Sequence, residues 1–249
     1  MKKYHYKIIT VCFWLAVWQI LSVVIQEEML FASPLITIKT LFRLLAQSDF
    51  WKVIASSFLR ITGGFFLALL AGILLAAFSY YSRLVRELMS PVMKVIQATP
   101  VASFIILALI WINSKNLAVL ISFLIVLPVV YSNVLRGFLE TDRKLLEMAR
   151  VFNIPFFLKM RYIFLPSVRP YLISAISVGL GLCWKAGVAA EVIGLPANSI
   201  GAELYDAKLY LLTPELFAWT FVIILLSMGF EKLVMYLIRR ISGNRVKNV

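Results

Sequence analysis

The chain has 249 residues, of which 62% are hydrophobic and 15% are charged, and its mean hydropathy is +0.92. Soluble domains are roughly 45–50% apolar and about 25% charged, so this composition excludes a soluble globular protein and indicates one that lies mainly in lipid. The formal net charge is +13, which would suggest a nucleic-acid partner for a soluble protein. Because the basic residues lie mainly between the apolar stretches, we expect them to set membrane topology, with no nucleic-acid partner.

Six stretches are apolar enough to cross a bilayer as helices, which takes about 20 residues each. The first follows Lys2, Lys3 and Lys7 but is not followed by a small-residue cleavage site, so we expect a retained anchor rather than a signal peptide. The sequence therefore predicts an all-α, polytopic membrane protein with six transmembrane helices, in which residues 1–249 form one transmembrane domain. The spans are expected near residues 8–25, 57–79, 93–112, 117–135, 171–190 and 216–238.

Basic residues are divided unevenly between the segments that join these spans. With the N-terminus inside, 18 of the 25 Lys and Arg residues fall in cytoplasmic segments and six in external ones. The excess on one side predicts that both termini are cytoplasmic. The remaining basic residue, Lys185, lies inside the fifth span.

The second span carries a small residue at every fourth position. One face of this helix is therefore smooth enough for another backbone to approach closely. We expect tight packing within the bundle, with a contact between subunits as the alternative. The residues are Gly64, Ala68, Gly72 and Ala76.

The longest cytoplasmic segment covers residues 136–169 and holds seven basic residues. Thr141 or Asp142 is expected to cap a helix whose apolar side chains fall on one stripe. Asn153, which tolerates a left-handed conformation, and Pro155 are expected to end that helix. A second short helix over 155–163 would end at Leu165 and Pro166. Two short helices with a forced turn predict a rigid projection that suits a protein partner, with a solvated basic loop as the alternative.

This segment reads Glu147-Met148-Ala149, three residues, Asn153, nine residues, then Ile163-Phe164-Leu165-Pro166. It resembles the EAA loop of the membrane permease subunits of bacterial ABC importers, whose pattern is E-A-A, three residues, G, nine residues, I-x-L-P. The spacing matches throughout, while Met148 replaces the middle alanine and Asn153 the glycine. Asparagine adopts the same turn geometry as glycine.

Other motifs are similar to the nitrate, sulfonate and taurine subgroup of that family. They are Ser33-Pro34-Leu35, Ser57-Phe58-Leu59-Arg60, Ala98-Thr99-Pro100 and Trp184 to Glu191. The resemblance implies the type I ABC importer permease fold, with a core of about 57–240 and a coupling loop of about 136–169. It also implies a homodimer in a bacterial inner membrane, a cytoplasmic ATPase dimer that binds ATP and Mg²⁺, and an extracytoplasmic substrate-binding protein.

The resemblance also implies roles for the loop residues. Glu147 would face the ATPase, Ala149 would keep the helix slim enough to enter a groove, and Asn153 would set the angle between the two short helices. Arg150 lies one turn from Glu147, so an intrahelical ion pair contributing about 0.2–0.5 kcal/mol is the alternative role for both. Pro155, Leu165 and Pro166 complete the set of expected coupling residues.

Polar residues within the spans are the candidates for a translocation pathway, because ionisable groups are rare in lipid. Lys185 lies about 14 residues, or roughly 21 Å, from the cytoplasmic start of the fifth span, in the outer half of the membrane. It either faces the pathway and attracts an anionic solute, or snorkels outward or pairs with Glu191. Glu191 is itself included among the pathway candidates.

A second group of candidates lies in the third span. Gln97, Thr99 and Ser103 lie around Pro100, which can kink a helix because it lacks a backbone N–H. These side chains either line the route or repair the helix locally.

The sequence excludes several chemical functions. No glycine is followed by lysine, so a phosphate-binding G-x-x-x-x-G-K-[ST] loop is absent and we expect no ATP hydrolysis and no bound cofactor. The single histidine, His5, lies in the basic N-terminal tail, away from any set that would support catalysis or bind a metal. A vitamin precursor such as a pyrimidine or riboflavin is an alternative to an anionic solute, and a channel or carrier without an ATPase is an alternative to the importer.

Overall fold

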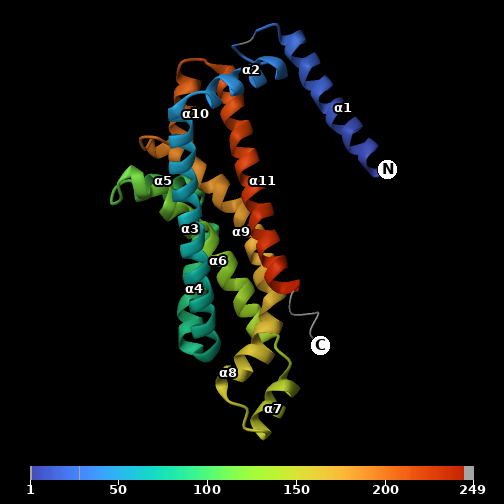
Figure 1. The fold of residues 1–249 in the computed structure, drawn as a ribbon. Helices are drawn as coiled ribbons and strands as arrows, with labels where there is room; N and C mark the ends of the chain where they lie inside the picture. The colour runs from blue at the N-terminus through green and yellow to red at the C-terminus, as the bar shows by residue number, and fades with distance from the viewer. Residues whose placement is uncertain (1, 28, 244–249) are drawn as a thin grey trace.

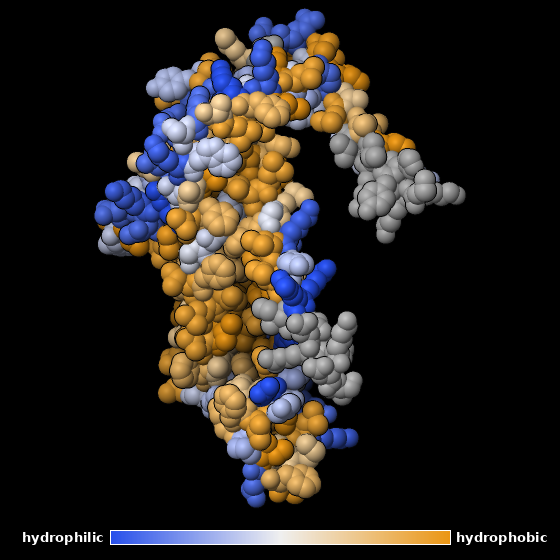
Figure 2. Space-filling view, in the orientation of Figure 1, coloured by the Kyte–Doolittle hydropathy of each residue, from blue (hydrophilic) through white to orange (hydrophobic). Residues whose placement is uncertain are grey.

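The computed structural model describes residues 2–27 and 29–243, and all regular elements in this part of the chain are helical (Figure 1). Long helices run side by side, short helices lie across one end, and a small helical loop projects at the other. Much of the surface in the middle of the molecule is apolar, and polar side chains lie at its two ends and at the edges of this apolar surface (Figure 2). The expectations that involve Glu28, Arg245, Lys247 and the side chain of His5 lie outside what is described.

Four helices are long and apolar enough to cross a membrane, which makes the chain a multi-pass membrane protein. They coincide with the second, fourth, fifth and sixth predicted spans. The first stretch lies in α1 (Lys2–Ile25), of which Cys12–Ile25 is an apolar helical part. The total of six spans and the cytoplasmic position of both termini stay predictions. The four helices are α3 (Ser48–Tyr81), α6 (Ser114–Leu139), α9 (Leu165–Gly194) and α11 (Thr213–Gly243).

The third predicted span is not one helix. It consists of α4 (Arg83–Ala98) and α5 (Val101–Ala108), which meet at an angle of 102°. Thr99 is extended, as expected for a residue before proline, and Pro100 is the N-cap of α5. The prediction of a continuous helix over 93–112 is therefore wrong, because the helix ends before Pro100 and a new helix begins after it, whereas a kink would have left one helix.

The core is formed by α3, α6 and α9, which pack closely through small residues. A Cβ atom built on Gly64 of α3 would lie 2.4 Å from the carbonyl oxygen of Val119 in α6, and one on Gly72 would lie 2.8 Å from Val130. Gly187 of α9 approaches Ile61 equally closely. The small-residue stripe therefore serves packing within the subunit, as predicted.

The end of the bundle opposite the projecting loop, which we expect to be external and therefore call the external end, is covered by α2 (Pro34–Leu45) and α10 (Ile200–Leu209). Ser33 caps α2 by accepting a hydrogen bond from the Ile36 amide at 3.3 Å. Trp18 of α1 donates to the Ala32 carbonyl at 3.0 Å and stacks on Phe217 of α11. The rest of α1 leans away from the other helices (Figure 1). Residues near its external end therefore attach α1 to the bundle.

The close contact at Gly64 predicts a specific loss of stability. We expect Gly64→Ala to lower the free energy of unfolding by about 1–3 kcal/mol, because the added methyl group overpacks the α3–α6 interface. Gly63→Ala is the matched control, since nothing lies within 4 Å of a Cβ atom at that position. Thermal unfolding of the detergent-solubilised variants measures the difference. Equal melting temperatures for the two variants would contradict the packing.

Candidate functional site

The projecting loop begins where α6 ends, with two polar residues in distinct roles. The hydroxyl of Thr141 is buried and donates to the Gly137 carbonyl at 3.2 Å, which closes the end of α6. The side chain of Asp142 accepts from the Lys144 amide at 2.9 Å. Asp142 is therefore the N-cap of α7 (Arg143–Val151), and Thr141 is not.

The turn after α7 has the predicted geometry. Asn153 has a φ of 51°, in the left-handed region that asparagine tolerates. The amide of Ile154 donates to the Ala149 carbonyl at 2.9 Å, which satisfies a carbonyl at the end of α7. Pro155 follows in an extended conformation and precedes α8 (Phe156–Lys159). The prediction of a short helix that ends in a forced turn at Asn153 and Pro155 is confirmed.

The second arm of the loop differs from the prediction. The chain is helical without a break from Phe156 to Gly194, passing through the π-helical turn η1 (Met160–Phe164) directly into α9. The Leu165 amide donates to the Met160 carbonyl, five residues back, and Pro166 fits into the first turn of α9. Leu165 and Pro166 therefore do not end the second helix.

The base of the loop is held by an interaction between α6 and α9. Arg136 Nε lies 2.7 Å from Glu140 Oε1, and the hydroxyl of Tyr171 in α9 donates to the other carboxylate oxygen. The hydrogen bond from Tyr171 and that from Arg136 hold the pKa of Glu140 below its usual value. The carboxylate therefore stays charged at neutral pH and links the two helices at the point where the loop leaves them.

The loop, which we expect to lie in the cytoplasm and outside the bilayer, exposes several large apolar side chains. Phe152 is 73% exposed and Phe157 is 74% exposed. Figure 2 shows apolar surface among charged residues at this end of the molecule. Exposed patches of this kind mark interaction surfaces. The other members are Leu145, Met148, Val151 and Phe156.

The charged residues of α7 are also exposed. Within residues 2–27 and 29–243 no ion pair joins Glu147 to Arg150, so the intrahelical pair is not formed. Ala149 is fully buried against the rest of the chain. Its methyl group therefore faces the body of the subunit, not the exposed side of α7.

The pathway candidates of the third span gather at the break between α4 and α5. Gln97 is exposed near the end of α4, and Ser103 is exposed in the first turn of α5. The Thr99 hydroxyl donates back to the Val95 carbonyl at 2.8 Å and so caps α4. Between these residues, Pro100 contributes a carbonyl that accepts from the Ser103 amide at 3.0 Å.

Lys185 lies on an exposed stripe of α9. The stripe contains Ser174, Val178, Gly181 and Lys185, at helical spacings of four, three and four residues. A Cβ atom at Gly181 would have nothing within 4 Å, so this face is open in the single chain. No described carboxylate pairs with Lys185, and the expected alternative pair with Glu191 is not formed.

Glu191 lies at the centre of a buried polar network at the external end of α9. Its side chain is 0% exposed. Ser57 of α3 donates to Glu191 Oε2 at 2.7 Å, and the Gly201 amide of α10 donates to the same atom at 3.3 Å. The Arg60 guanidinium lies 3.5 Å from Oε1. The carboxylate therefore joins α3, α9 and α10.

Two partners of Glu191 were missed from the sequence, although Ser57 and Arg60 belong to one of its motifs. Ser57 also accepts from the Ile200 amide at 2.9 Å, and Arg60 donates to the Ala197 carbonyl at 3.1 Å. The external loop at 195–199 is thereby held against α3. The sequence signal for the pair of Arg60 and Glu191 was that each is the single charged residue of its sign in or next to its span: Arg60 near the start of the second span and Glu191 at the end of the fifth.

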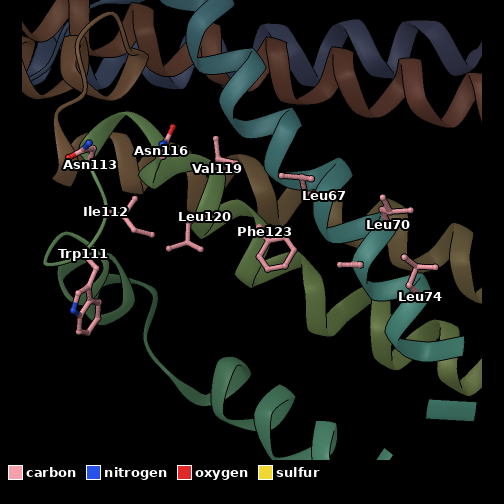
Figure 3. A pocket seen from close by; sticks show the side chains of 11 residues that line it. Leu67, Leu70, Leu74, Trp111, Ile112, Asn113, Asn116, Val119, Leu120 and Phe123 are labelled. Atoms are coloured by element: carbon pink, nitrogen blue, oxygen red, sulfur yellow. The ribbon is translucent and has the colours of Figure 1, made fainter. Parts of the chain in front are cut away.

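One cavity is lined by none of the predicted pathway residues. It has a volume of about 720 Å³ and lies between α3 and α6 (Figure 3). Leu67, Leu70 and Leu74 line one wall and Phe123 faces them from α6, while Asn113 and Asn116 lie near one end. The walls are predominantly apolar, and this groove brings together none of the predicted pathway residues.

The network at Glu191 predicts that Ser57 stabilises the external end. Ser57→Ala removes a donor to the carboxylate and an acceptor for the Ile200 amide, and leaving such buried groups unpaired costs about 1–3 kcal/mol. We expect a lower melting temperature and faster proteolysis of the 195–199 loop. Ser56→Ala, one position away and outside the network, is the control. Equal proteolysis rates in the two variants would rule out this role for Ser57.

Comparison with known proteins agrees with this architecture. The family described as "Binding-protein-dependent transport system inner membrane component" matches residues 68–248. A Bacillus subtilis protein assigned to aliphatic sulfonate transport as a permease is 23% identical over 82% of this chain and 74% of the relative. The taurine transport system permease protein of Escherichia coli is 24% identical over 79% and 71%, respectively. The nitrate import permease protein of Leptolyngbya laminosa is 27% identical over 65% of this chain, which spans 57% of that relative. The chain therefore belongs to the family of binding-protein-dependent transport system inner membrane components.

Proposed function

We propose that the chain is the permease subunit of an ATP-driven importer and that it forms a translocation pathway for a small anionic solute. Two copies would build the pathway, a separate ATPase dimer would bind ATP and Mg²⁺ and drive it, and an extracytoplasmic binding protein would deliver the solute. The observation that carries this proposal is the loop over 141–166. It presents exposed apolar and charged side chains on a helical support that continues into α9.

The loop suits the transmission of movement from an ATPase to the membrane. A packed helical element moves as a body, and the unbroken helix from Phe156 to Gly194 connects the loop directly to a span. The bond between Glu140 and Tyr171 ties the other end of the loop to the same helix. A displacement of the loop by an ATPase would therefore move α9 with it.

The residues of the loop divide into two groups in this proposal. Glu147, Arg150 and the exposed Phe152 would contact the ATPase. Ala149, Asn153 and the segment from Pro155 to Pro166 would hold the shape of the loop. The burial of Ala149 supports a role in packing α7 against its own subunit in place of entry into a groove.

The stripe around Lys185 supports a pathway between two copies of the chain. The exposed faces of α3 and α11 carry large apolar side chains such as Leu70 and Leu225, which suit lipid. The α9 stripe carries a serine, a glycine and a lysine beside one apolar residue, Val178. Because a charged side chain in contact with lipid is costly, this face is better suited to a second subunit and a hydrated pathway.

An anionic solute is supported by the same lysine and by the relatives. The names of the relatives refer to sulfonates, nitrate, taurine and bicarbonate. Two copies of Lys185 about a two-fold axis would place two positive charges in the pathway. Glu191 is enclosed by Ser57, Arg60 and Gly201, which supports a holding role for its carboxylate rather than contact with the solute.

The docking role predicts that charge reversal on the loop prevents assembly. We expect Glu147→Lys to weaken association with the ATPase at least about tenfold, because mutation of a carboxylate paired across an interface typically costs 2–5 kcal/mol. Glu87→Lys introduces the same charge change on α4, away from the loop, and is the control. Co-purification of the ATPase from detergent extracts measures the effect. Normal recovery with Glu147→Lys would refute the docking role.

The pathway role predicts a separate transport defect. Lys185→Ala is expected to slow solute uptake into reconstituted vesicles several-fold while leaving association with the ATPase intact, because the loop is unchanged. Lys52→Ala, which removes an exposed lysine at the start of α3, is the control. Unchanged uptake kinetics in Lys185→Ala would remove this residue from the pathway.

A further inference from the structure

A second, smaller cavity lies between α4 and α6, at the end of the bundle that carries the loop. Its volume is about 380 Å³. Unlike the groove between α3 and α6, it contains basic side chains in its lining, beside the apolar Met93, Leu135 and Leu139. The side chains with polar groups are Arg86, Ser90, Lys94, Gln97, Tyr131, Ser132 and Arg136.

The amphipathic character of α4 explains how this lining arises. Arg86, Ser90, Lys94 and Gln97 follow one another at spacings of four, four and three residues and share one face of the helix. The stripe Leu84, Leu88, Val92 and Val95 is exposed on a different face, where it suits lipid. The helix therefore directs its polar face toward α6 and away from lipid.

The first of the three cations is held in place without being neutralised. Arg86 Nε donates to the Ser79 carbonyl at 3.0 Å, and its Nη2 donates to the Tyr80 carbonyl at 3.4 Å. These acceptors at the end of α3 fix the orientation of the guanidinium but carry no formal charge. Ser79 is itself fixed by Tyr131, whose hydroxyl donates to Ser79 Oγ at 3.0 Å.

The other two cations differ in their pairing. Lys94 is exposed to the cavity and has no ion-pair partner among the described residues. Arg136 pairs with Glu140, but Tyr171 also hydrogen-bonds that carboxylate. The cavity therefore brings three positive side chains together, and Glu140 is the one carboxylate paired with any of them in the described part of the chain.

We propose that the cavity between α4 and α6 binds an oxyanion, with Lys94 and Arg86 as its main ligands and Ser90 and Gln97 as additional hydrogen-bonding groups. Arginine and lysine form strong, charge-assisted hydrogen bonds with sulfonate, phosphate and related oxyanions. Gln97 lies beside the break at Thr99 and Pro100, and Arg86 lies near the loop end of the bundle. The polar face of α4 therefore forms a row of about 16 Å along the helix axis.

Two sources can supply this chemistry. One is the transported solute on its way to the cytoplasm, and this assignment of the source rests on the proposed function. The other is the phosphate of an anionic lipid headgroup, because basic pockets between helices on the cytoplasmic side of a membrane bind such groups. Binding of the oxyanion itself depends only on the geometry of the cavity.

The test uses the full-length chain in nanodiscs of phosphatidylcholine, with radiolabelled sulfate as the soluble probe. Lys94→Gln is expected to weaken sulfate binding about tenfold, since it removes a hydrogen bond from a charged group. Lys94→Arg is expected to restore binding. Arg83→Gln is the matched control, because Arg83 lies on the same helix but pairs with Glu87 and does not line the cavity.

A second arm replaces sulfate with phosphatidylglycerol and counts bound lipids by native mass spectrometry. Lipid binding that is lost in Lys94→Gln but kept in Arg83→Gln supports the site with a headgroup as occupant, even if sulfate does not bind. Arg86→Gln, checked for folding by its elution from size-exclusion chromatography, tests a second ligand. The proposal is overturned if neither probe distinguishes Lys94→Gln and Arg86→Gln from Arg83→Gln. That failure would leave the docking test at Glu147 unaffected.

Discussion

The unbroken helix from Phe156 to Gly194 is the constraint on which the account of this molecule depends. The second arm of the loop and the span at the centre of the bundle are one helix, joined through the π-helical turn at Met160–Phe164. Such a turn provides a backbone bond five residues apart and lets Pro166 enter the helix without ending it. Any force applied to the loop is therefore carried into the membrane by backbone hydrogen bonds, which a flexible linker would not allow.

The packing around α9 determines what such a force moves. Close contacts at Gly64, Gly72 and Gly187 leave no room for an additional side-chain atom between α3, α6 and α9, so these helices are tightly packed. At the external end, Glu191 joins α9 to α3 and α10 through Ser57, Arg60 and Gly201. Movement of α9 would therefore carry neighbouring helices with it as a packed group, consistent with a rocking motion in place of a local one.

The sequence predicted features that depend on local chemistry. The spans follow from hydropathy, and the left-handed Asn153 follows from the tolerance of asparagine for that geometry. The small-residue stripe was correctly interpreted because a small residue at every fourth position lets another helix approach closely. The break at Pro100 was underestimated, because the sequence gives the loss of one N–H but not the direction of the chain beyond it.

Features that depend on long-range contacts were not accessible in the same way. Ser57, which donates to Glu191, lies 134 residues away from it, and nothing in hydropathy or spacing connects the two residues. The continuity of α8 with α9 was also missed, because proline usually marks a boundary and the π-helical turn that accommodates it has no simple sequence pattern. The cavity between α4 and α6 combines two amphipathic faces whose pairing only the fold defines.

The most direct test of the account is a pair of distances measured by pulsed electron paramagnetic resonance. In the first sample, spin labels replace the exposed Phe157 and Val178 in only one of the two copies of the chain. In the second sample, Val178 alone is labelled, in both copies. When nucleotide closes the ATPase, the account predicts a narrow and unchanged distance within one chain and a shifted distance between the two copies. A distance within the chain that broadens or shifts, with no change between the copies, would contradict the rigid connection.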